Sequence, residues 1–169
     1  VYVNSNGGND VSGDGSQVNP YATLGKAFSV NGTKNNIEYV VQGGHVEERA
    51  SGTLSATGNN TYVHWDEVGE RSRFQWNNDS GGFPKIITIP VGSYGQIWEG
   101  INVSDISGGS FRKTTQVSAF GSNAEHTAIV DIYSAGSTNM IYHLVRVGGD
   151  VRKGLLLFKE NVEATGGYS

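Results

Sequence analysis

Short runs of apolar residues, separated by Gly, Asn and Ser, make up most of this chain, and helical periodicity is nearly absent. Runs of this kind are typical of β-strands. The expected strands cover residues 37–41, 60–65, 72–76, 84–91, 95–103, 111–120, 126–133, 139–147 and 151–159. The chain is therefore expected to be all-β.

One segment, 21–30, has the pattern of a helix. Leu24, Ala27 and Phe28 fall on one face at the i, i+3, i+4 spacing, and Pro20 fits the first helical turn. An amphipathic helix next to many strands is suited to covering the open apolar end of a β structure.

The strands differ between the two halves of the chain. The runs that begin at Ile37, Thr61 and Lys85 lie roughly 24 residues apart, which is close to one coil of a parallel β-helix. Beyond residue 84 the strands lengthen, alternate apolar with polar residues, and follow one another through short Gly-rich turns. Such turns favour antiparallel neighbours in a sandwich or jelly roll.

These patterns predict a short β-helix-like part with one capping helix over residues 1–80, followed by an antiparallel β-sandwich over residues 81–169. The polar stretch 77–83 forms the expected boundary. Each part is small for an independent core, so the two are expected to be stabilised by contacts with each other or with partner chains.

Composition removes several classes of function. The chain has 169 residues, 25 of them Gly, no Cys, and a net charge of −4. The absence of Cys excludes disulfides and cysteine nucleophiles. Scattered Lys and Arg argue against nucleic-acid binding, and no apolar run is long enough for membrane insertion.

The N-terminal loop contains Asp10, Ser12 and Asp14 in a spacing similar to the start of an EF-hand calcium loop. An EF-hand needs a bidentate Glu at its twelfth position, where this chain has Tyr21. A looser calcium site at Asp10 and Asp14 stays open, against a turn in which these side chains bond their own backbone. We expect no bound metal and no cofactor.

The opening segment, residues 2–28, resembles the start of right-handed parallel β-helix proteins of the pectate-lyase-like superfamily. The residues that carry the resemblance are Tyr2, Val3, Gly15, Ser16, Asn19, Pro20, Tyr21, Thr23, Leu24 and Ala27. This superfamily includes phage tailspikes and bacterial polysaccharide-degrading enzymes.

The second half resembles, more faintly, the β-sandwich tips of phage tail fibres and tailspikes. The resemblance rests on the stretch 84–121, which contains "KIITIP" at 85–90 and the turn "SGGS" at 107–110 followed by a lysine-bearing strand. It also rests on "VDIYS" at 130–134 and on the closing stretch 143–162. Together the two resemblances imply an extracellular virion protein, assembled as a homotrimer and bound to other virion proteins.

Catalytic signatures of β-helix hydrolases are missing, since no adjacent Asp pair accompanies His45. Glu47, Glu48 and Arg49 are most simply a solvated strand edge. His64 and Asp66 share a strand face and are expected to form a surface hydrogen-bonded pair. The sequence shows no pair of carboxylates placed to act as general acid and general base, so we expect no enzymatic activity.

Aromatic residues are numerous for a Gly-rich chain and suggest binding of a host surface glycan, because sugars stack on Trp and Tyr rings. Core packing is the alternative, favoured for Trp76 and Trp98. The candidate ligand-binding residues are Tyr62, Trp65, Trp76, Tyr94 and Trp98.

The sequence thus predicts a non-enzymatic phage structural protein, such as a tail fibre, tailspike or capsid appendage, with glycan binding as an added role. Two alternatives stay open: a β-helix polysaccharide lyase or glycoside hydrolase, and a secreted carbohydrate-binding module.

Overall fold

The structure, a computed structural model, describes residues 1–77, 85–106, 115–120, 128–130, 141–147 and 155–157. These contain one helix, α1 (Leu24–Asn31). The strands are β1 (Tyr2–Val3), β2 (Ile37–Val41), β3 (Val46–Arg49), β4 (Thr61–Trp65), β5 (Arg73–Trp76), β6 (Lys85–Ile89), β7 (Ile97–Glu99), β8 (Asn102–Asp105), β9 (Thr115–Phe120), β10 (Ala128–Val130), β11 (Ile141–Val147) and β12 (Leu155–Leu157).

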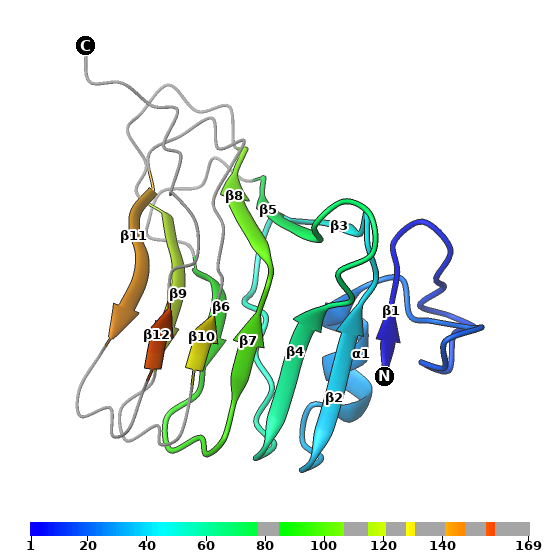
Figure 1. Ribbon diagram of the computed structural model, residues 1–169, viewed down its shortest axis with the longest axis horizontal. Coiled ribbons are helices and arrows are strands. Elements are labelled where there is room, and N and C mark those ends of the chain that lie inside the picture. Colours follow the sequence, from blue (N-terminus) through cyan, green and yellow to red (C-terminus); the bar gives the residue numbers. More distant parts are fainter. Residues whose placement is uncertain (78–84, 107–114, 121–127, 131–140, 148–154, 158–169) are drawn as a thin grey trace.

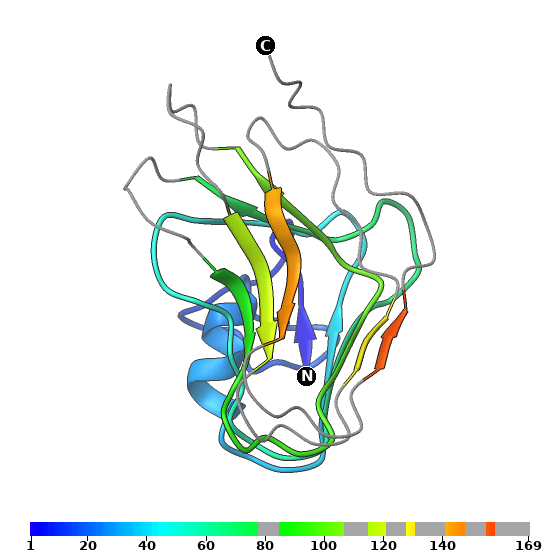
Figure 2. The same cartoon turned by 90° about the vertical axis from the view of Figure 1, so that its left-hand side faces the viewer.

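The strands form three sheets that the chain visits in turn as it winds along the molecule. The first sheet has the order β1-β2-β4-β7-β10-β12, the second β3-β5-β8, and the third β11-β9-β6. The six strands of the first sheet lie side by side in Figure 1, and Figure 2 shows the sheets surrounding a common interior. The architecture is a stack of parallel β coils.

The expected antiparallel sandwich is wrong. Every strand pair among the described residues is parallel, including those of the second half. The alternation of apolar and polar residues led to this wrong prediction, because parallel sheets usually have both faces covered and so lack such alternation. Here Ile87 and Ile89 are buried in the core, whereas Thr88 between them is only partly buried. The turns at 107–110, 134–138 and 148–150 lie outside the described residues.

The expected repeat is correct for its first step and wrong for its second. Ile37 pairs with Thr61, so the first coil has 24 residues. Lys85, however, pairs with Gln116 in the third sheet, and the true successor of β4 is β7. The second coil has 35 residues, measured between Asn59 and Tyr94.

Side chains on alternate positions of each strand fill the interior. Along the first sheet, Tyr39, Val63 and Trp98 are register partners in successive coils, and all three are fully buried. Because side chains alternate between faces, their neighbours in sequence point outward. This alternation places Tyr62 and His64 on the outer face of β4, and Ile97 and Glu99 on that of β7.

The predicted capping helix is present, but it starts later than expected. Thr23 is the N-cap, and its Oγ1 accepts a hydrogen bond from the Lys26 N–H at 3.0 Å. Pro20 precedes the helix, because Tyr21 instead bridges to Val3 beside the first sheet. Leu24 and Phe28 are buried in the core, as the capping role requires.

A recurring left-handed residue turns the chain into the first sheet in three successive coils. Asn36, Asn60 and Gly95 have φ values of 60°, 53° and 70°. The Asn60 Nδ2 donates to Asn36 Oδ1 at 2.9 Å, which links two coils through side chains. Asn and Gly are the residues that adopt this conformation most readily.

The predicted domain boundary at 77–83 lies almost wholly outside the described residues. The first sheet nevertheless runs across it, because β4 pairs with β7.

Candidate functional site

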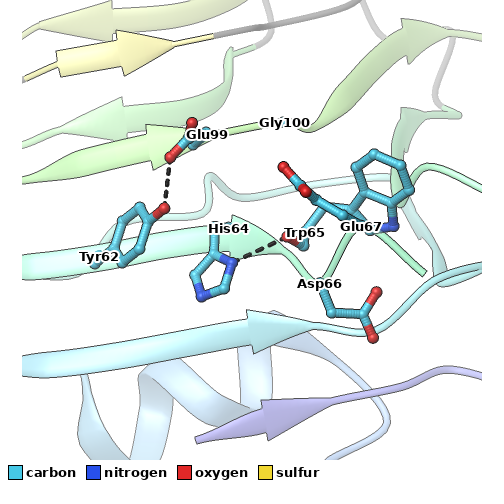
Figure 3. A pocket seen from close by; sticks show the side chains of 7 residues that line it. All are labelled: Tyr62, His64, Trp65, Asp66, Glu67, Glu99 and Gly100. Carbon is cyan, nitrogen blue, oxygen red and sulfur yellow. Dashed lines mark hydrogen bonds between the residues drawn. The ribbon is translucent and has the colours of Figure 1, made fainter.

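An open hollow of about 310 Å³ lies on the outer face of the first sheet, where β4 and β7 are neighbours. Four of its residues come from the strands themselves, and the others follow the strand ends (Figure 3). The described residues that line it are Tyr62, His64, Trp65, Asp66, Glu67, Glu99 and Gly100.

Parallel register brings these side chains together. His64 and Glu99 are register partners on adjacent strands, and Tyr62 stands one outward position before His64. Their inward neighbours Val63 and Trp98 are fully buried, which holds both strands in place against the core. The outer side chains therefore stand on a rigid base.

Tyr62 is the centre of this group. Its ring stacks on the His64 ring with centroids 4.4 Å apart and planes 18° apart, and its hydroxyl donates to the Glu99 carboxylate. Burial, then the hydrogen bond and charge of Glu99, raise the pKa of Tyr62 to about 12. The phenol is thus a neutral donor at physiological pH.

His64 is fixed by oxygen atoms on both sides of its ring. Its Nδ1 lies 2.9 Å from the Trp65 carbonyl oxygen, and its Nε2 lies 3.0 Å from Glu38 Oε1. A neutral imidazole can donate to only one of them, whereas an imidazolium donates to both. Both ring nitrogens are therefore engaged by oxygen atoms of the protein.

Trp65, Asp66 and Glu67 form the rim where β4 ends. The Asp66 N–H continues the ladder to the Val41 carbonyl at 3.1 Å, and its Oδ1 accepts from the Val68 N–H at 3.1 Å. The exposed Glu67 has a φ of 60°. This left-handed residue ends the strand and turns the chain.

The Trp65 indole forms one wall of the hollow. The guanidinium carbon of Arg71 lies 5.1 Å from the ring centroid, within cation–π range. The indole Nε1 is buried without a hydrogen-bond partner. Trp65 as a whole is partly buried, and it is one of the residues that line the hollow.

The structure brings together two of the five predicted ligand-binding residues, Tyr62 and Trp65. Trp98 is fully buried and Trp76 is 6% exposed, so both pack in the core. Tyr94 is 45% exposed but lies at the turn before β7, outside the hollow.

The expected His64–Asp66 pair is not formed. Asp66 lies beyond the end of β4 and bonds the Val68 backbone, while His64 bonds Glu38 on the neighbouring β2. Sequence reasoning also missed Glu67, Glu99 and Gly100. Glu99 occupies the same place on β7 as its register partner His64 does on β4. The sequence did not reveal this equivalence, because the second coil is longer than the first.

The Asp10 and Asp14 carboxylates serve the N-terminal loop. Asp10 Oδ1 accepts from the N–H groups of Ala22 and Thr23, and its Oδ2 accepts from the Thr23 hydroxyl at 2.7 Å. Asp14 Oδ1 accepts from the Ser16 N–H at 2.8 Å. Within the described ranges, no three His, Cys, Asp or Glu side chains are grouped to hold a metal.

The expected solvated edge at 47–49 is wrong for Glu47, which is buried below the helix N-terminus. Its Oε2 accepts from the Leu24 N–H at 2.7 Å, and its Oε1 accepts from Arg49 Nη1 at 2.7 Å. His45, fully buried, accepts the Ser5 N–H at Nδ1 and points Nε2 toward Glu47 Oε2 at 3.6 Å. This cluster holds α1 on the coils.

No helix in the part of the chain that the structure describes is both long and apolar enough to cross a bilayer. No known protein family, no curated protein and no solved structure matches this chain.

Proposed function

We propose that this chain is a carbohydrate-binding β-helix protein of the phage tail-fibre or tailspike kind, which binds a glycan on the outer face of its first sheet. The observation that carries the proposal is the convergence of Tyr62, His64 and Trp65 with carboxylates around one open hollow. Proteins bind sugars by stacking aromatic rings on the apolar faces of the sugar and by hydrogen bonds from charged or polar side chains to its hydroxyls.

The geometry suits binding to an extended chain of sugars. The hollow is open, and it lies on the outer face of a sheet whose strands are anchored by buried side chains. A rigid surface loses little conformational entropy when a ligand binds. Virion location and trimeric assembly are proposed from the two resemblances together, those of the opening segment and of the second half. Three linked sites would raise the avidity of a weak single site.

The test is a glycan array followed by calorimetry with the best ligand. Trp65→Ala is expected to weaken binding at least about tenfold, from the loss of a stacked ring. Tyr94→Ala is the matched control, because Tyr94 is an exposed ring outside the hollow. Equal losses in both variants, or no glycan binding by the parent protein, would contradict the proposal.

An enzyme is the second candidate, favoured by Asp66, Glu67 and Glu99 around the same hollow. Two carboxylates on either side of a bound sugar are what glycoside hydrolysis requires. Incubation with polysaccharides and detection of reducing ends or unsaturated products tests this candidate. If the parent protein cleaves a polysaccharide and Glu99→Gln does not, the function is catalysis and not binding alone.

A further inference from the structure

The side chains that line the hollow carry mostly negative charge. Asp66, Glu67 and Glu99 line it, and none of its described lining residues is Lys or Arg. Glu38 adds a fourth carboxylate beside it, bonded to His64 Nε2 at 3.0 Å.

The basic side chains near the hollow offset this charge only in part. Both ring nitrogens of His64 are already engaged, one by Glu38 and the other by the Trp65 carbonyl. Arg71 lies over the Trp65 ring and does not line the hollow. A negative field at the hollow agrees with the raised pKa of Tyr62, to which burial, Glu99, Glu38 and Glu67 all contribute.

We infer that the glycan bound in this hollow carries free amino groups, as in deacetylated hexosamines, and is not an acidic polysaccharide. This inference rests on the proposed function and names its ligand class. An ammonium group forms charge-assisted hydrogen bonds with carboxylates and is attracted by the Tyr62 and Trp65 rings. A uronate or sialate brings a like charge among several carboxylates, which opposes binding.

The experiment compares three oligosaccharides of equal length by calorimetry: glucosamine, N-acetylglucosamine and galacturonate oligomers. The glucosamine oligomer is expected to bind at least about tenfold more tightly than its acetylated form, and the galacturonate oligomer least. Raising the salt concentration should weaken glucosamine binding and leave N-acetylglucosamine binding nearly unchanged.

Variants locate the effect in the hollow. Glu67→Gln and Glu99→Gln should bring the ratio between glucosamine and N-acetylglucosamine affinity toward one. Glu48→Gln is the control, because Glu48 is an exposed carboxylate on β3 that bonds Asn77. It should leave the ratio unchanged.

The outcomes separate the inference from the function beneath it. Equal affinity for the amino and acetylated oligomers, or a preference for galacturonate, overturns the inference and leaves glycan binding intact. Binding of a trilysine peptide as tight as that of the glucosamine oligomer also overturns it, in favour of a cationic peptide. Failure of all sugars to bind removes the proposed function itself.

Discussion

Phe28 and Tyr39 meet edge to face, with ring centroids 4.9 Å apart and planes at 90°. Phe28 comes from α1 and Tyr39 from the first coil, and Phe28 also meets Trp98 of a later coil at 5.8 Å. One helical side chain thus contacts rings of two coils. This is how α1 closes the interior of the stack.

Phe28→Ala is expected to lower the free energy of unfolding by roughly 3 to 5 kcal/mol, because it leaves a cavity among buried rings. Denaturant titration followed by circular dichroism measures the loss. Val30→Ala is the control on the same helix, since Val30 is 45% exposed. Similar small losses in both variants would mean that α1 does not seal the core.

Asn60 is expected to tolerate Gly better than Ala. Its φ of 53° costs an L-residue such as Ala about 1 to 2 kcal/mol, which Gly avoids. Both variants lose the hydrogen bond to Asn36. The order of denaturation midpoints should be parent, Asn60→Gly, Asn60→Ala, and equal midpoints for the two variants would contradict the role of this turn.

The start of the fold could be predicted from sequence because its signals are local. The helical face of Leu24 and Phe28 depends only on nearby residues, and so do the strand runs that begin at Ile37 and Thr61. The strand direction in the second half could not be predicted this way. Alternation of apolar and polar residues, such as that around Ile87, indicates a sheet with one solvent-exposed face. A stack of parallel coils has such a face, just as an antiparallel sandwich does.

Glu47 is expected to make stability fall in acid. Burial alone would raise the pKa of Glu47, but the approach of His45, the Leu24 N–H and the charge of Arg49 outweigh it and hold the pKa below the ordinary 4.5. Protons therefore bind more tightly to the unfolded chain, and the stabilisation present above pH 4.5 is lost as the pH falls through the folded-state pKa.

Glu47→Gln should reduce this acid dependence and cost roughly 1 to 3 kcal/mol at neutral pH, because it removes the carboxylate that the partly buried Arg49 bonds. Denaturation midpoints measured across the acid range test this. Glu48→Gln, the exposed neighbour, should change neither quantity. An unchanged acid profile in Glu47→Gln would show that other carboxylates control it.

Tyr62 is expected to ionise with a pKa of about 12, through burial and through Glu99. The difference in tyrosinate absorbance between the parent and Tyr62→Phe isolates its titration, and Glu99→Gln should lower the pKa toward 10. A raised folded-state pKa stabilises the fold at lower pH, and this contribution is lost as the pH rises from 10 through 12. Unchanged titration in Glu99→Gln would contradict the Tyr62–Glu99 contact.

The site was only half predictable for a physical reason. Tyr62 and Trp65 stand out as rings on one short strand, so composition identified them. Glu99 joins them only through the register between coils, and a second coil of 35 residues after one of 24 breaks any fixed spacing. The burial of Glu47 likewise depends on where α1 docks.

The most direct test of glycan binding in the hollow is an NMR titration that follows the indole N–H signals of the three tryptophans, assigned with Trp→Phe variants. Our account predicts that a glucosamine oligomer shifts the Trp65 signal and leaves that of the buried Trp98 in place. Saturable binding with an unmoved Trp65 signal, or no response to any sugar, would contradict it.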